Sequence, residues 1–213
     1  MKTALLLMVG VLLAACGVQA ADTAEEGWIQ LFDGKTLKGW KAGEHPENWK
    51  VENGELVASG PRSHLFYMGD DESKPATFEN FHFKAQVKTT PGSNSGLYFH
   101  TKFEEATWPS FGHEAQVNNS HGDPVRTGSL YNVVKNLEAP AKDDEWFTEE
   151  IIVKGQHILI KVNDKVIVDY TEPKDVQGTR KLSKGTFAIQ AHDPKSVTYY
   201  KNIQVKPLPS EAK

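Results

Sequence analysis

Strict alternation of apolar and polar residues within Phe78–Thr89 constrains the fold of this chain more than any other feature. In a strand, successive side chains point to opposite faces, so a period of two separates the two faces. The apolar side chains of one face are Phe81, Phe83, Ala85 and Val87. The segment therefore predicts a strand in a sheet with one buried and one solvated face, which is typical of antiparallel sheets.

Comparable short runs recur along the chain, separated by turns rich in Gly, Asn and Asp. The other expected strands are Trp28–Phe32, Asn48–Glu52, Glu55–Ala58, Gly96–His100, His113–Asn118, Ser129–Val134, Trp146–Lys154, Gln156–Asn163, Lys165–Tyr170, Thr186–His192 and Val197–Val205. The pair Asn53-Gly54 is a strong hairpin signal, because both residues readily take positive φ. We find no internal repeat and no amphipathic helix of three turns. The pattern predicts an all-β fold, an antiparallel sandwich or jelly roll, as a single domain over residues 27–208, followed by a tail at 209–213.

Residues 1–15 resemble a bacterial lipoprotein signal peptide. Lys2 precedes an apolar run at Ala4–Leu13, and Leu13-Ala14-Ala15-Cys16 follows. The resemblance implies that Cys16 becomes the lipidated first residue of the mature protein, with residues 16–26 as a flexible tether. Gly17 after the cysteine resembles lipoproteins sent to the outer membrane. The expected location is therefore the bacterial cell envelope, anchored in the outer membrane and facing the periplasm; the alternative is a plain secretory signal.

Charge and cysteine content exclude some functions. The formal net charge is −4, and no block rich in Lys or Arg stands out, so nucleic acid is not an expected partner. Cys16 is the only cysteine, which excludes a disulfide within the domain. We expect an uncharged or weakly charged ligand.

The stretch 94–134 carries the candidate site. Read as strands, its core face collects Leu97, Phe99, Ala115 and Val117, with Phe187 and Ile189 from the later strand. In a strand, residues at odd and even positions face opposite sides of the sheet, which is called the parity rule below. This rule places a polar set on the face opposite the core: Tyr98, His100, Glu114, Gln116, Asn118, Tyr131, Gln190 and His192. A carboxylate, imidazoles, amides and phenols on one face suit a hydroxyl-rich ligand, whereas the alternative is a merely hydrated sheet face.

A series of short motifs recurs in an order typical of one protein family. The motifs are Leu31-Phe32-Asp33-Gly34-Lys35-Thr36-Leu37 with Gly39-Trp40, Trp49–Leu56, Asn94–Phe99, Gly112 with Glu114 and Gln116, Thr127–Tyr131 and Asn202–Val205. Over Trp28–Leu208 the chain resembles the DUF1080 family of 3-keto-disaccharide hydrolase domains. The resemblance implies a concanavalin-like jelly roll and a hydrolase of 3-keto-disaccharides or other 3-keto-glycosides. Two departures, His100 where Arg is frequent and His113 where an aromatic residue is usual, bear on substrate preference or on activity itself.

The expected chemistry follows from the number of carboxylates. Ordinary glycoside hydrolysis uses two carboxyl groups, but the run Glu114–Asn118 offers one carboxylate and two amides. In a 3-keto sugar the ketone acidifies the C2 proton, so the C1 oxygen can leave by elimination and water can then add. This route needs a base, stabilisation of an enediolate and assistance to the leaving group. It would use a substrate made by a separate sugar oxidoreductase.

Each candidate has a catalytic and a structural interpretation. Glu114 is the expected general base, and its alternative role is an ion pair with Arg126 or a lysine. His100 and His192 are candidates for proton transfer, enediolate stabilisation or metal binding, or else are hydrogen-bonded scaffold residues. The expected sugar-binding residues are Tyr98, Gln116, Asn118, Tyr131 and Gln190, with Trp108 as a stacking residue in the loop 104–111.

A metal site stays unassigned at this stage. His113, His121 and Asp123 are attractive ligands, but His113 has the opposite parity to Glu114, and the segment His121–Pro124 is typical of a turn. The spacing of residues in the sequence does not show whether three ligands meet at one site, so the binding of a divalent cation is possible but not assigned. A non-catalytic carbohydrate-binding or surface-interaction lipoprotein is the second functional hypothesis, because one fold serves many functions.

Overall fold

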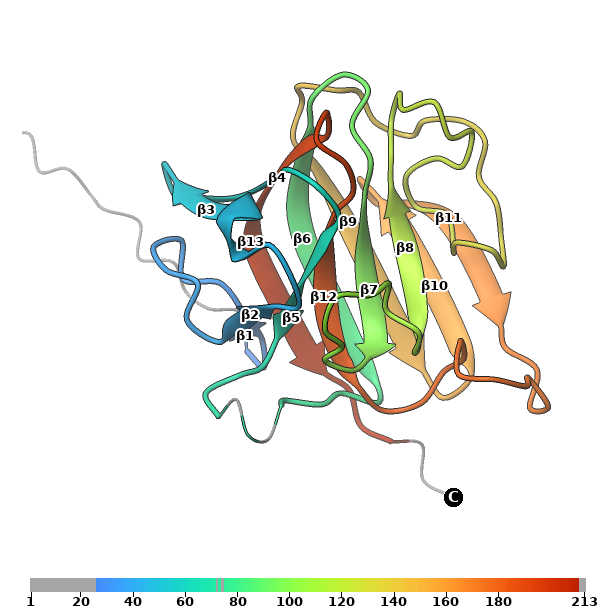
Figure 1. The fold of residues 1–213 in the computed structure, drawn as a ribbon. Coiled ribbons are helices and arrows are strands. Elements are labelled where there is room, and N and C mark those ends of the chain that lie inside the picture. The colour runs from blue at the N-terminus through green and yellow to red at the C-terminus, as the bar shows by residue number, and fades with distance from the viewer. Residues whose placement is uncertain (1–25, 72, 74, 211–213) are drawn as a thin grey trace, which may run out of the picture.

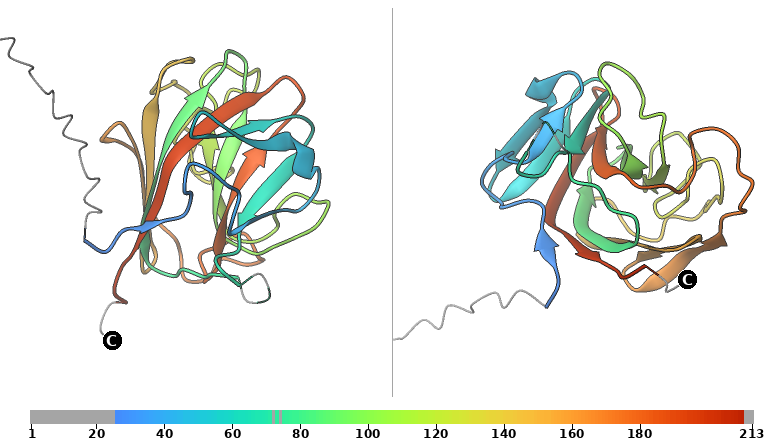
Figure 2. Two further views of the ribbon diagram at one scale, coloured as in Figure 1. Left: turned by 90° about the vertical axis from the view of Figure 1, so that its left-hand side faces the viewer. Right: turned by 90° about the horizontal axis from the view of Figure 1, so that it is seen from below.

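The structure is a computed structural model that describes residues 26–71, 73 and 75–210. The predicted signal peptide and Cys16 lie outside the described residues. Two antiparallel sheets stack as layers, and this confirms the predicted all-β jelly-roll sandwich (Figures 1 and 2). Among the described residues, no helix has the length and apolar character needed to span a bilayer.

The larger sheet has eight strands, in the order β11-β10-β9-β6-β13-β4-β3 with β1 paired to β13. Their bounds are β1 Ile29–Gln30, β3 Trp49–Glu52, β4 Glu55–Ser59, β6 Phe81–Thr89, β9 Phe147–Lys154, β10 His157–Val162, β11 Lys165–Thr171 and β13 Val197–Pro207. The predicted hairpin is confirmed, since β3 pairs with β4 around Asn53, whose φ of 53° fits the turn.

The smaller sheet has five strands, in the order β2-β5-β12-β7-β8. Their bounds are β2 Trp40–Ala42, β5 Ser63–Tyr67, β12 Thr186–Ala191, β7 Ser95–Thr101 and β8 His113–Val117, and a short 3₁₀ helix, η1, spans Pro46–Asn48. The strand β5 was not among the expected strands, because it is buried on both faces and its residues do not alternate between apolar and polar. The segment 129–134 is not the expected strand; Leu130 makes only isolated bridges, to Ala115 and Val134.

The core lies between the facing sides of the two sheets. The four apolar positions that defined β6 are at most 1% exposed. Aromatic rings join the layers: Phe83 of β6 lies 4.7 Å from Phe187 of β12, and Phe81 lies 6.0 Å from Phe99 of β7, between ring centroids. Burying each such ring contributes about 1.5–3 kcal/mol. The predicted core residues on β7, β8 and β12 are all buried here, so the opposite faces of these strands point away from the core.

The parity rule is wrong at His100. This residue has φ of 56°, and the pairing of β7 with β12 skips it, because Thr101 faces Thr186 while Phe99 faces Phe187. Two glycines make room for the bulge, since a Cβ on Gly112 or Gly185 would lie 2.6 or 2.5 Å from the His100 carbonyl carbon. A bulge of one residue shifts the parity of its strand. His100 therefore turns to the core side, where its ring lies 5.5 Å from that of Phe81.

Candidate active site

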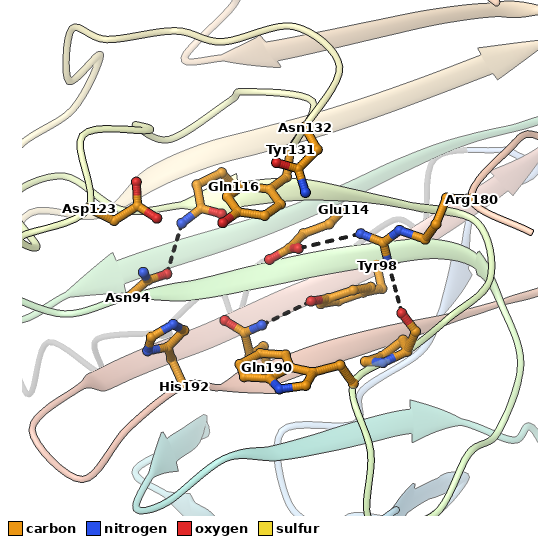
Figure 3. Close-up of a pocket in the computed structure, with 12 residues that line it drawn as sticks. Asn94, Tyr98, Glu114, Gln116, Asp123, Tyr131, Asn132, Arg180, Gln190 and His192 are labelled. Atoms are coloured by element: carbon orange, nitrogen blue, oxygen red, sulfur yellow. Dashed lines mark hydrogen bonds and ion pairs between the residues drawn. The ribbon is translucent and has the colours of Figure 1, made fainter.

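A pocket of about 380 Å³ opens on the outer face of the five-stranded sheet (Figure 3). Its lining includes seven residues that the sequence predicted: Tyr98, Trp108, Glu114, Gln116, Tyr131, Gln190 and His192. Four further lining residues were not predicted: Asn94, Pro109, Asn132 and Arg180; the fifth, Asp123, was considered only as a metal ligand. Side chains of β7, β8 and β12 form the floor because they have the parity opposite to the core residues.

Glu114 lies at the floor of the pocket and is 4% exposed. The hydroxyl of Tyr98 donates to its carboxyl group, and a guanidinium nitrogen of Arg180 lies 3.9 Å from Oε2. Burial raises the pKa of Glu114 to about 7, although the hydrogen bond from Tyr98 and the charge of Arg180 act in the opposite direction. A carboxyl with this pKa can both accept and return a proton near neutral pH.

Gly96 provides the space for this carboxyl group. It faces Gln116 across the β7–β8 ladder, and an added Cβ would lie 2.3 Å from Oε1 of Glu114. The glycine within the motif Asn94–Phe99 is thus required by a side chain on the neighbouring strand. Any larger residue at this position would displace the carboxylate from its place.

A row of hydrogen bonds continues from Glu114 across the floor. Gln190 donates to the hydroxyl of Tyr98 at 3.0 Å, and its amide nitrogen lies 3.4 Å from Nε2 of His64. Burial lowers the pKa of His64 to about 3, so this ring is neutral. Within the described residues Gln190 Oε1 has no hydrogen-bond partner, although it is buried in the lining of the pocket. This oxygen is available to accept a hydrogen bond from a ligand.

Arg180 reaches the pocket from the loop between β11 and β12. Its guanidinium donates to the Pro109 carbonyl at 2.7 Å, and Thr179 Oγ1 donates to the Ser110 carbonyl at 2.7 Å. These bonds tie the loop to the segment 102–112, which carries Trp108. Sequence reasoning missed Arg180 because it lies between the expected strands Lys165–Tyr170 and Thr186–His192, and a single arginine in such a connection carries no distinguishing signal.

A buried pair secures the base of the same loop. His113 Nε2 lies 2.7 Å from Glu172 Oε1, and the backbone of Leu182 donates to the same carboxylate. Both members of the pair are buried. His113 therefore serves the scaffold and does not join His121 and Asp123, so that metal constellation is not formed.

The rim of the pocket carries Trp108, which is 44% exposed. Its ring lies 5.4 Å from the ring of His64, and the guanidinium carbon of Arg62 lies 5.6 Å from its centroid. The exposed indole beside a polar floor has the form of a stacking surface for a sugar ring. Tyr131, although not on a strand, is placed at the pocket by a backbone hydrogen bond to the Glu114 carbonyl at 2.9 Å.

Two predicted site residues lie outside the pocket. His100 accepts the backbone N–H of Ser183 at Nδ1, so its Nε2–H donates to the Glu79 carbonyl at 2.9 Å. The side chain of Asn118 is fully buried and donates to the carbonyls of Asp123 and Val125. Asn118 lies just beyond the end of β8, where the parity rule no longer applies. Both side chains form hydrogen bonds with backbone groups and do not face the pocket.

The alternative partner of Glu114 is also corrected. Arg126 donates to Asn118 Oδ1 at 3.0 Å and to the carbonyls of His121 and Asp123, each at 2.8 Å. It therefore closes the loop 118–126 on itself. Glu114 is paired with Arg180 instead.

One group of side chains could be considered for a metal ion. Single ligand atoms of His121, His192 and Asp193 lie within 4.8 Å of one another, and all three side chains are partly exposed. His192 lines the pocket, so the group borders the site directly.

Comparison with known proteins places the chain in a family. Residues 27–206 match the family described as 3-keto-alpha-glucoside-1,2-lyase-like domains. The chain belongs to this family. The resemblance to DUF1080, the 3-keto-disaccharide hydrolase domains, is thereby confirmed.

A curated relative, the 3-keto-disaccharide hydrolase of Bacteroides thetaiotaomicron, is 26% identical over 171 residues, which cover 68% of this chain and 59% of that protein. The chain thus corresponds to only part of the length of that relative.

Solved structures show how widely the fold of the family is shared. A provisionally assigned glycosyl hydrolase of Parabacteroides distasonis has a TM-score of 0.73 and 22% identity, covering 86% of this chain and 95% of its own. The carbohydrate-binding module CBM66 of Bacillus subtilis has a TM-score of 0.58 and 13% identity, covering 79% and 96%. An endo-β-1,3(4)-glucanase of family GH16 has a TM-score of 0.55 and 15% identity, covering 85% and 91%. Because this fold carries both enzymes and binding modules, function has to be argued from the pocket.

The pocket of this family member combines a proton acceptor with a cation. Glu114 supplies a buried carboxyl whose pKa is near neutrality, and Arg180 places positive charge beside it. Gln116, Tyr131 and the unpartnered oxygen of Gln190 supply polar groups around them. Such an arrangement can remove a carbon-bound proton and stabilise the oxyanion that results.

Proposed function

We propose that the protein hydrolyses the glycosidic bond of 3-keto-disaccharides or other 3-keto-glycosides. The observation that carries this proposal is the Glu114 carboxyl, buried at the floor of a pocket with a pKa of about 7 and 3.9 Å from Arg180. Abstraction of a proton beside a ketone requires a base whose pKa is close to the working pH. It also requires a positive charge where the enediolate oxygen develops, and Arg180 meets that requirement.

The proposed reaction has two halves. In the first, Glu114 takes the C2 proton, the C1–O bond breaks, and the leaving oxygen takes up a proton from its surroundings and departs as an alcohol while the sugar becomes an unsaturated ketone. In the second, the oxygen of a water bonds to C1, the water releases one proton to replace the one consumed, and Glu114 returns its own proton to C2. The sum is hydrolysis, with one water consumed and the 3-keto group unchanged. Gln116, Tyr131 and Gln190 orient the sugar hydroxyls in this proposal, and Trp108 stacks on a sugar ring.

The matched variant Glu114→Gln tests the chemical step. It keeps the size of the side chain and removes the base, so turnover of a 3-keto-disaccharide should fall by about 10²- to 10⁴-fold while binding survives. In D₂O, the wild-type product should carry deuterium at C2, because the second half of the reaction reprotonates that carbon. Full activity of the variant would exclude Glu114 as the base, and hydrolysis without C2 labelling would indicate direct displacement at C1.

The unoxidised disaccharide separates this proposal from its alternatives. It should be inert, because its C2 proton has no neighbouring ketone. Turnover of that sugar would instead favour a two-carboxylate mechanism, for which Asp123 is the second carboxylate in the pocket. Tight binding of unmodified glycans without turnover of any keto sugar would favour a carbohydrate-binding module.

We also propose that the protein works in the cell envelope, anchored through Cys16, on substrate made by a separate sugar oxidoreductase. The support is the signal-like pattern of residues 1–16. Cys16→Ser should release the protein from the membrane fraction or leave its signal uncut. Unchanged fractionation and unchanged electrophoretic mobility would contradict the anchor.

A further inference from the structure

His192 and Asp193 form a dyad at the edge of the pocket. His192 Nδ1 lies 2.9 Å from Asp193 Oδ2, and the ring of His192 lines the pocket beside the indole of Trp108, with centroids 5.8 Å apart. The dyad follows directly after β12, whose Gln190 belongs to the floor. The proposed reaction so far assigns no group that protonates the leaving oxygen or takes a proton from the attacking water.

The surroundings of Asp193 keep its carboxyl ionised. Burial on its own would raise its pKa, but hydrogen bonds from Ser196, His192 and the backbone of Lys195 lower it to about 2. The distances are 2.7 Å from Ser196 Oγ to Oδ2 and 2.9 Å from the Lys195 nitrogen to Oδ1. An ionised carboxylate can only accept hydrogen bonds. The proton of the His192–Asp193 contact therefore resides on Nδ1 of His192.

This assignment determines what the other ring nitrogen can do. With Nδ1 protonated, Nε2 carries the lone pair of the neutral ring, and no described residue forms a hydrogen bond with it. Nε2 is thus the only ring nitrogen of His192 that can exchange a proton with a ligand. The titratable groups around this ring are His121 and Asp193, together with His64 from β5.

The third member of the cluster is oriented as a donor. His121 Nδ1 accepts the backbone N–H of Asp123 at 3.0 Å, so its proton is on Nε2, which lies 3.8 Å from Asp193 Oδ2. A metal ion would need a lone pair at that Nε2, because the imidazole ligand of a metal is unprotonated at the ligating atom. The hydrogen bonding of His121 therefore favours a His–Asp–His proton-handling cluster over a cation site.

We propose that Asp193 is a positioning residue that keeps the proton of His192 on Nδ1, so that Nε2 serves as the second proton carrier of the reaction. This inference rests on the proposed function. Protonated His192 gives its Nε2 proton to the oxygen that leaves C1. Neutral His192 then takes a proton at Nε2 from the water whose oxygen bonds to C1. Glu114 takes and returns the C2 proton, His192 gives and regains the oxygen proton, and the enzyme ends as it began.

The test is Asp193→Asn, read by ¹⁵N NMR of the histidine ring nitrogens together with kinetics. The amide can still accept from Lys195 through Oδ1, whereas its NH₂ group now faces His192 and donates to Nδ1. We expect the ring proton of neutral His192 to move from Nδ1 to Nε2. Turnover of a 3-keto-disaccharide should fall by about 10²- to 10⁴-fold with little change in KM, as expected when a dyad holds the wrong tautomer.

A matched control comes from a second His–Asp pair away from the pocket. His157 Nε2 lies 2.7 Å from Asp169 Oδ1 on the β10–β11 ladder, so Asp169→Asn makes the same chemical change there. It should leave both turnover and the His192 signals unchanged. His192→Gln assigns the His192 signals by their loss and should lower turnover at least as much as Asp193→Asn.

The outcomes separate this inference from the proposed function. An Nδ1–H signal retained in Asp193→Asn, or a changed tautomer with full turnover, would overturn the positioning role. Activity abolished by a chelator and restored by a divalent cation that shifts the His121 and His192 signals would overturn it in favour of a metal site. If the wild-type protein turns over no 3-keto sugar, the proposed function fails, whereas the tautomer change still tests the role of Asp193.

Discussion

Glu114→Gln should make the protein more stable, and the gain should grow with pH. The carboxyl is buried, and its pKa of about 7 compares with 4.5 for an unperturbed glutamate. Below pH 4.5 it is protonated in both the folded and the unfolded chain and has no effect. As the pH rises to 7, the unfolded chain loses this proton while the folded chain keeps it, so the free energy of unfolding decreases.

The size of the effect follows from the pKa difference. A pKa difference of about 2.5 between the folded and the unfolded chain corresponds to about 3 kcal/mol in the free energy of unfolding. This figure is an upper bound for a buried group with polar partners. Glutamine has no charge to lose, so the stability difference between variant and wild type should grow by about 2–3 kcal/mol between pH 4.5 and pH 8. The same burial that destabilises the folded protein at high pH prepares Glu114 as a base near neutrality.

Urea unfolding followed by tryptophan fluorescence at pH 4.5, 6 and 8 would measure this difference. Gln116→Ala is the matched control, because it alters the same pocket floor, including the hydrogen bond to Asn94, without removing a titrating group. Its stability difference from wild type should be the same at every pH. A Glu114→Gln difference that is also constant with pH would refute the burial argument, because the carboxyl would then titrate alike in both states.

Three further perturbations test other parts of the structure. Gly96→Ala should lower turnover at least 10-fold, because the added Cβ would lie 2.3 Å from Glu114 Oε1. The control Gly122→Ala should leave turnover unchanged, because its added Cβ meets nothing within 4 Å. Steady-state kinetics compares the two variants. Glu149→Met should raise the melting temperature, more at pH 8 than at pH 5, because burial raises the pKa of the Glu149 carboxyl; calorimetry measures this. Trp108→Ala should raise KM about 10-fold with little change in kcat, and an unchanged KM would remove Trp108 from substrate binding.

Periodicity predicted those parts of the site that lie on regular strands. Tyr98, Glu114, Gln116 and Gln190 occupy β7, β8 and β12, where alternate residues must face away from the core. The apolar residues between them are buried, and this fixes the opposite face without knowledge of how the strands pair. For these residues, local sequence and final position are linked by strand geometry alone.

The same rule failed where the backbone departs from a regular strand. His100 sits in a bulge that exists because Gly112 and Gly185, distant in sequence from each other, both approach its backbone closely. Asn118 comes after the last residue of β8, and its amide closes a loop. The pattern of one strand contains no information about a glycine on another segment, so the bulge at His100 could not be predicted from it. The pattern also does not show at which residue β8 ends, so the position of Asn118 could not be predicted either.

The sequence by itself determined the sandwich, its core and the polar pocket floor, because these follow from a period of two and from turn chemistry. Only the tertiary structure decided which loop residues complete the pocket. Arg180 reaches Glu114 because the Glu172 pair with His113 and the carbonyl of Pro109 hold its loop in place. Such contacts join segments tens of residues apart through single hydrogen bonds, which leave no periodic trace in the chain. The charge beside the base is therefore a property of how the loops pack.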